Sequence, residues 1–165
     1  MKNLNILKIA QICGGTVECG EAGIPCGEAA GFVTDSRQVL PDFVFIAAKG
    51  ENTDGHDYIP QAFERGALAV IAEHIPEGAS HAGPLILVPD SFEALREIAA
   101  FYRRQLKVKV VGITGSVGKT STKEMIASVL SRRYRVHKTE GNFNNEIGLP
   151  LSVLRIPEDA EIAVL

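Results

Sequence analysis

The chain has 165 residues, of which 45% are hydrophobic and 22% charged, so it can build a core and is not a disordered protein. Its formal net charge of −3 identifies no class of partner. No apolar run approaches the length of about 18 residues typical of a membrane-spanning helix. The N-terminus also lacks the pattern of a signal peptide, and we therefore expect a cytoplasmic protein without membrane insertion.

The first two thirds of the chain alternate short apolar strands with helices. Apolar spacing predicts a helix over residues 4–13, a strand over 43–48 and a helix over 58–65. Further strands are predicted over 67–72 and 85–88. Asp90 can cap a longer helix, with Glu93 three residues later. This alternation predicts an α/β architecture.

Charge changes sign along the chain. Residues 1–106 hold 8 basic and 14 acidic side chains, whereas residues 107–165 hold 9 basic and 6 acidic ones. A new strand also begins after residue 106, and we expect a boundary there between two domains, 1–106 and 107–165, the second binding something anionic. Ordinary variation of surface charge is the alternative explanation.

A strand predicted over residues 107–113 runs directly into a glycine-rich turn and a helix, which is the context of a phosphate-binding loop. The glycines let backbone N–H groups point at an anion, Lys119 adds positive charge, and the Thr120 hydroxyl can ligate Mg²⁺. The predicted nucleotide-binding residues are Gly115, Ser116, Val117, Gly118, Lys119, Thr120 and Ser121, with Lys119 and Thr120 as catalytic residues. In the strict pattern, however, a glycine stands where this chain has Ile113, and Gly112 comes one place too early. The alternative is a glycine-rich turn with a solvated lysine.

The chain after the phosphate loop is short. Its helix is expected to bury Met125, Ile126, Val129 and Leu130, and two more strands are predicted near residues 134–137 and 162–165. A nucleotide-binding sheet usually has about five or more strands. We therefore expect an N-terminal fragment, inactive alone, with an exposed sheet edge at residues 162–165.

Three segments resemble the Mur ligases, the cytoplasmic amide-bond ligases of peptidoglycan synthesis. Residues 114–121 (TGSVGKTS) have the offset phosphate loop of that family. Residues 139–150 (TEGNFNNEIGLP) resemble the T-x-G-N-x-N-N-x-I-G-x-P segment of one member. Residues 34–56 resemble the N-terminal domain pattern T-D-[ST]-R-x(3)-P-G-x-x-F-x-A-x-x-G-x-x-x-D-[AG]-H, with Asp42 in place of its first glycine.

The resemblance implies an ATP-dependent, ADP-forming ligase that needs Mg²⁺. It would join D-alanyl-D-alanine to UDP-N-acetylmuramoyl-tripeptide through an acyl phosphate, and so serve cell-wall biogenesis, cell shape and division. Residues 1–106 would be the UDP-substrate-binding domain, and residues 107–165 the start of a mostly parallel-sheet ATP-binding domain, incomplete here. The partners would be small molecules, and the full-length protein a monomer.

The resemblance also implies substrate-binding residues: Thr34, Asp35, Ser36, Arg37, Asn142, Asn144 and Asn145. For residues 34–37 the sequence alone also allows an ordinary polar turn. For the three asparagines it also allows loop positions that tolerate a left-handed backbone. Three arginines, Arg132, Arg133 and Arg135, complement a helix C-terminus, and no nucleic-acid site is expected.

Three other functions remain open. One is a related Mur ligase that adds the third residue of the stem peptide, and the second is a non-catalytic module that binds a nucleotide or UDP-sugar. The third, a phosphate-loop kinase or GTPase, is disfavoured because no N-K-x-D motif occurs.

Overall fold

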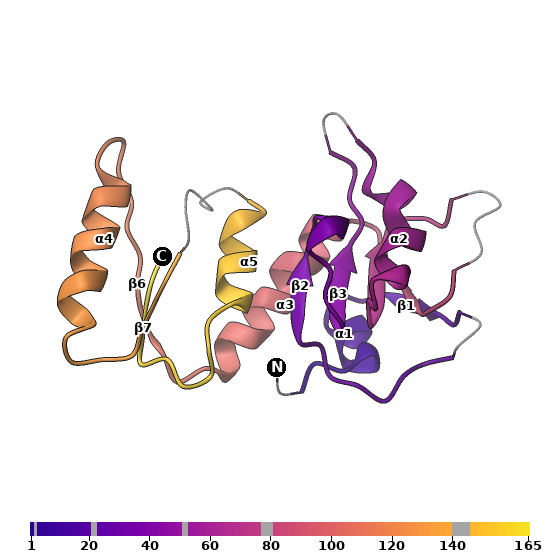
Figure 1. Cartoon of the computed structure of the whole chain (residues 1–165), viewed down its shortest axis with the longest axis horizontal. Helices are drawn as coiled ribbons and strands as arrows, with labels where there is room; N and C mark the ends of the chain where they lie inside the picture. The colour runs from indigo at the N-terminus through magenta and orange to yellow at the C-terminus, as the bar shows by residue number, and fades with distance from the viewer. Residues whose placement is uncertain (2, 21–22, 51–52, 77–80, 140–145) are drawn as a thin grey trace. The chain divides into compact units, whose positions relative to one another are not determined.

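The computed structural model describes residues 1, 3–20, 23–50, 53–76, 81–139 and 146–165. They form two compact units, Met1–Ile98 and Ala99–Leu165. The division falls within helix α3 (Ser91–Gln105) (Figure 1). The domain boundary expected near residue 106 stays a prediction.

The first unit is built on a five-stranded sheet. Its elements are α1 (Ile6–Ile12), β1 (Thr16–Glu18), β2 (Gly31–Val33), η1 (Ser36–Gln38), β3 (Phe43–Ile46), η2 (Gly55–Tyr58), α2 (Ile59–Glu64), β4 (Ala69–Ala72) and β5 (Leu85–Leu87). The strand order is β1-β5-β4-β3-β2. All neighbours are parallel except β1, which runs antiparallel to β5.

Local signals in the sequence fix where these helices begin. The Asn5 side chain accepts a hydrogen bond from the Lys8 N–H at the start of α1. Asp90 Oδ1 accepts from the N–H groups of Phe92 and Glu93 at 2.8 Å, as expected for the cap of α3. The buried Ser91 hydroxyl donates to the Ala47 carbonyl oxygen at 2.9 Å, which ties the start of α3 to the chain just after β3. All four residues of β4 are buried, so this strand crosses the core of the unit.

The second unit has a three-stranded parallel sheet with a helix on each face. Its elements are β6 (Lys109–Val111), α4 (Lys119–Leu130), β7 (Val136–Lys138), α5 (Gly148–Leu154) and β8 (Ile162–Val164). Ile162 and Val164 pack with Ala127 of α4, whereas Ala163 points to the other face and packs with Ile156, just after α5. Figure 1 shows α4 and α5 on opposite sides of these strands. The mixed α/β fold with mostly parallel strands is confirmed.

Two expectations about the second unit were wrong. The strand order is β6-β8-β7, so β8 lies between two partners and is not a sheet edge. Helix α4 buries Lys123 and Ala127, while Met125 and Val129 are 70% and 72% exposed. With 3.6 residues per turn, positions 123, 126, 127 and 130 share one face, and positions 125 and 129 lie outside it.

Candidate functional site

The phosphate loop predicted over residues 114–121 lies where β6 runs into α4. Gly115 has φ +151° and Gly118 has φ +82° with ψ 1°, both in the region that favours glycine. Gly118 is the N-cap of α4, and no side chain caps the helix there. The first N–H groups of the helix are therefore left for another acceptor, and the loop residues are exposed except for the half-buried Lys119. This is the arrangement that binds a phosphate group.

Lys119 lies over this loop. Its Nζ donates to the carbonyl oxygen of Gly115 at 2.6 Å. Thr120 and Ser121 follow in the first turn of α4, with both side chains exposed. The predicted nucleotide-binding residues thus come together in one loop and one helical turn. Ser116 and Val117 form the exposed tip, with Val117 91% exposed.

Sequence reasoning missed a buried lysine in the next turn of the helix. Lys123 is only 7% exposed, and its Nζ donates to the carbonyl oxygen of Thr139 at 2.6 Å, directly after β7. The available signal was its spacing: Lys123 follows Lys119 by four residues and precedes Ala127 by four, which places it on the buried face.

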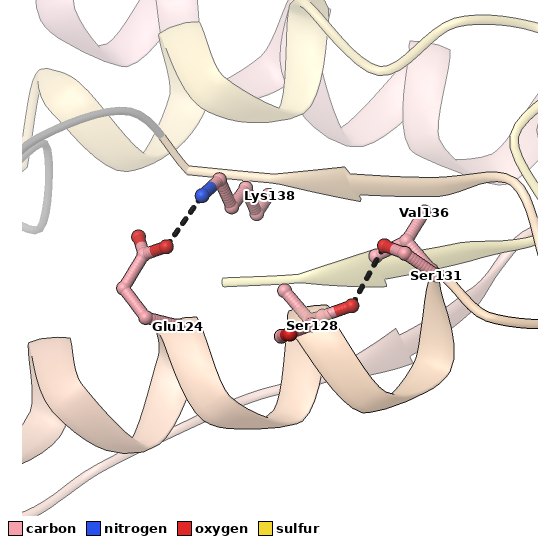
Figure 2. Close-up of a pocket in the computed structure, with 6 residues that line it drawn as sticks. Glu124, Ser128, Ser131, Val136 and Lys138 are labelled. Atoms are coloured by element: carbon pink, nitrogen blue, oxygen red, sulfur yellow. Dashed lines mark hydrogen bonds and ion pairs between the residues drawn. The ribbon is translucent and has the colours of Figure 1, made fainter.

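A pocket of about 390 Å³ lies between α4 and β7 (Figure 2). Its lining residues are Glu124, Ala127, Ser128, Ser131, Val136 and Lys138. The Lys138 amine pairs with the Glu124 carboxylate, and this hydrogen bond lowers the pKa of Glu124 below its ordinary value. None of the predicted site residues lines this pocket.

The turn formed by Thr34, Asp35, Ser36 and Arg37 follows β2. Both carboxylate oxygens of Asp35 accept from the Arg37 guanidinium, at 2.9 Å from Nε and from Nη2. These side-chain bonds, followed by one from the Arg37 N–H, lower the pKa of Asp35. The buried Ser36 hydroxyl donates to Gln61 Oε1 at 2.7 Å. Of these four residues, only Arg37 has its side chain largely in solvent, and its guanidinium is already paired with the Asp35 carboxylate.

The predicted substrate residues Asn142, Asn144 and Asn145 lie outside the described residues. The described chain before them ends at Thr139, which is buried, and resumes at the exposed Glu146.

Asp54, His56 and His74 bring three possible metal ligands within 4.8 Å of one another. The Nε2 atom of the buried His56 accepts from the Glu73 N–H at 3.0 Å, so its proton must be on Nδ1, which lies 2.6 Å from Asp54 Oδ1. Both ring nitrogens are thus engaged within the protein. The His56 backbone N–H and ring bonds lower the pKa of Asp54. The cluster is therefore better explained as a structural contact that ties η2 to the end of β4 than as a metal site.

Among the described helices, none is long and apolar enough to cross a membrane.

Comparison with known proteins identifies relatives of both units. The family described as "Mur ligase family, catalytic domain" matches residues 28–103, and "Mur ligase middle domain" matches residues 113–165. The UDP-N-acetylmuramoyl-tripeptide–D-alanyl-D-alanine ligase of Bacillus subtilis is 50% identical over 135 residues, which are 82% of this chain and 30% of that protein.

Solved structures agree. A crystal structure of MurF from Acinetobacter baumannii has a TM-score of 0.87 at 34% identity, and covers 98% of this chain and 35% of its own. MurF ligase from Thermotoga maritima, in complex with ADP, has a TM-score of 0.72 at 41% identity, and covers 82% of this chain and 31% of its own. The chain thus spans about a third of the length of these relatives. On both the matched segments and the structural likeness, the chain belongs to the Mur ligase family.

Proposed function

We propose that the protein carrying this chain joins D-alanyl-D-alanine to UDP-N-acetylmuramoyl-tripeptide, with conversion of ATP to ADP and phosphate. The observation that carries the proposal is the phosphate loop. Gly115 and Gly118 have positive φ values, α4 begins at Lys119 without a side-chain cap, and the Lys119 amine donates to the Gly115 carbonyl oxygen. The relatives named for this reaction, at 34–50% identity, support the choice of substrates.

In this proposal the chain supplies the nucleotide end of the reaction. The loop N–H groups and the Lys119 amine bind the β- and γ-phosphates and offset negative charge on the phosphoryl group as it moves to the substrate carboxylate. The carboxylate must be activated as an acyl phosphate because it is a poor electrophile. The amine of D-alanyl-D-alanine then attacks it and phosphate leaves.

The residues of the loop also fit a magnesium ion. The hydroxyl of Thr120 is exposed in the first turn of α4, beside the phosphate-binding backbone, as a hard oxygen ligand should be. Bound Mg²⁺ would supply charge neutralisation at the phosphate oxygens. The ADP present in the Thermotoga maritima relative supports nucleotide binding by this loop.

The first unit is proposed to bind the UDP end of the substrate at the turn formed by Thr34, Asp35, Ser36 and Arg37. Ser36 would act indirectly, because its buried hydroxyl is bonded to Gln61 and holds the turn on α2. Arg37 would reach a phosphate with the guanidinium edge that Asp35 leaves open. Asn142, Asn144 and Asn145 are proposed to contact substrate or nucleotide. We further propose a cytoplasmic monomer.

The test is to supply the complete protein with ATP, Mg²⁺, UDP-N-acetylmuramoyl-tripeptide and D-alanyl-D-alanine. We expect phosphate release that requires both substrates, together with a product whose mass equals their sum less one water. Omitting D-alanyl-D-alanine and offering a UDP-muramoyl-dipeptide with a single amino acid tests the related ligase that adds the third residue. Nucleotide binding without any product would instead identify a binding module.

A further inference from the structure

Two lysines join α4 to the end of β7, and they do so in very different environments. Lys123 lies on the buried face of α4, 7% exposed, and donates to the backbone carbonyl of Thr139 at 2.6 Å. Lys138 is about half exposed and pairs with Glu124 across the pocket between α4 and β7 (Figure 2). An exposed ion pair of this kind contributes little to stability.

A buried lysine is an uncommon choice for the face of a helix that packs on a sheet. Lysine is almost never fully buried unless it is paired, because its charge loses water. The Glu124 carboxylate is 3.9 Å from Nζ and itself half exposed. The neighbouring buried-face residues Ile126, Ala127 and Leu130 form an apolar cluster with the sheet, and an apolar side chain at 123 would continue it.

The strand register shows what the Lys123 bond holds in place. Val111 of β6 and Lys138 of β7 both pair with Val164 of β8, so the three residues form one row across the sheet. The phosphate loop begins at Thr114, three residues after that row on β6, and Thr139 is the first residue beyond the row on β7. Because β8 lies between β6 and β7, these two strands are two strand spacings apart, or about 10 Å. Lys123 also lies one helical turn after Lys119, on the same side of α4.

We propose that Lys123 is a positioning residue for the ligase reaction: it ties the end of β7, at Thr139, to the helix that follows the phosphate loop. The bond runs from the helix that begins at Lys119 to the backbone carbonyl at which the chain leaves the sheet. A hydrogen bond from a charged amine to a neutral carbonyl is stronger than one between two neutral groups, and burial shields this bond from water. This inference rests on the proposed function.

The decisive comparison is Lys123→Met against Lys138→Met in the complete protein. Both changes remove one amine that joins α4 to the end of β7, and methionine preserves most of the apolar length. We expect Lys123→Met to lower kcat for substrate-dependent phosphate release by about 10- to 100-fold, since small misplacements of reacting groups have effects of this size. The KM for ATP should stay within about threefold, because the phosphate loop is unchanged. Lys138→Met should leave both constants within about twofold.

Rescue and folding measurements separate positioning from mere stability. Lys123→Arg keeps a charged donor and should recover part of kcat, and circular dichroism at 20 °C should show Lys123→Met folded. The proposal is overturned if folded Lys123→Met turns over like the parent, if Lys138→Met loses as much kcat, or if both variants at 123 fail to fold. A parent protein that releases no phosphate with its substrates would instead overturn the proposed function.

Discussion

The amine of Lys119 donates to the carbonyl oxygen of Gly115 at 2.6 Å, four residues earlier in the same loop. The positive charge is therefore held over the loop. A phosphate oxygen is a stronger acceptor than a carbonyl because it is charged, so a nucleotide can take over this hydrogen bond with little movement of the side chain.

Lys119→Ala is expected to abolish ligation in the complete protein. Loss of one charged contact to the transferring group typically lowers turnover by about 100-fold or more, and no other lysine lies in the loop sequence. Phosphate release at saturating ATP measures the effect. Lys109→Ala, which removes an exposed lysine from β6, is the matched control and should behave like the parent. Near-parental turnover of Lys119→Ala would contradict the assignment.

Gly118→Ala and Gly112→Ala should differ although neither added methyl group meets another atom within 4 Å. Gly118 has φ +82°, where a side chain costs about 1–2 kcal/mol, whereas Gly112 has no positive φ. Nucleotide affinity, measured by titration calorimetry, should therefore fall by about 5- to 30-fold for Gly118→Ala only. Equal loss in both variants would contradict the assignment of the cost to the backbone conformation of Gly118.

Asp54→Asn should make stability less sensitive to acid. Hydrogen bonds from the His56 backbone and ring hold the pKa of Asp54 below its ordinary value. A carboxyl group whose pKa is lower in the folded than in the unfolded chain stabilises the fold at pH values above its unfolded pKa of about 4. This stabilisation is lost as the pH falls through the pKa of the folded state. Urea unfolding should show a deficit of Asp54→Asn relative to the parent at pH 7 that shrinks toward pH 3.

The exposed Asp57 provides the control for that experiment, because it lies in the same short helix η2. Asp57→Asn is made in parallel, so that the loss of one acidic side chain from η2 is common to both variants. A deficit of Asp54→Asn that grows on acidification would have the wrong sign and would refute the account.

Val164→Ala and Val110→Ala test the position of β8 in the second sheet. Val164 is fully buried between β6 and β7, whereas Val110 on the edge strand β6 is 40% exposed. The first change should lower the free energy of unfolding by about 1–3 kcal/mol, and the second by about 0.5 kcal/mol at most. Chemical unfolding of the 165-residue chain measures both. Similar losses would mean that β8 is as exposed as an edge strand.

Local patterns in the sequence predicted most elements and the phosphate loop. Asp90 marked the start of α3 because a cap depends on its nearest neighbours alone. The strand, glycine turn and helix around Lys119 were likewise visible from spacing. The resemblance added the family, which the composition could not have given.

Features that depend on tertiary contacts were missed. Apolar character alone predicts that Met125 and Val129 are buried, but the helix turns them away from the sheet, and Lys123 takes a buried position instead. The place of β8 between β6 and β7 depends on the order of strands in space, which a linear pattern does not encode. The hydrogen bond from the Glu73 N–H to His56 joins residues 17 apart in the sequence, and no local sequence pattern predicts it.

The antiparallel pairing of β1 with β5 has a consequence during synthesis of the chain. Thr16 pairs with Leu87, about 70 residues later, and among the described strands β1 pairs with β5 alone. At a translation rate of about 5–20 residues per second, β1 waits roughly 4–14 s for its partner to be made. Until β5 is made, the backbone edge of β1 has no strand partner among the described strands, which leaves this segment open to non-native strand pairing.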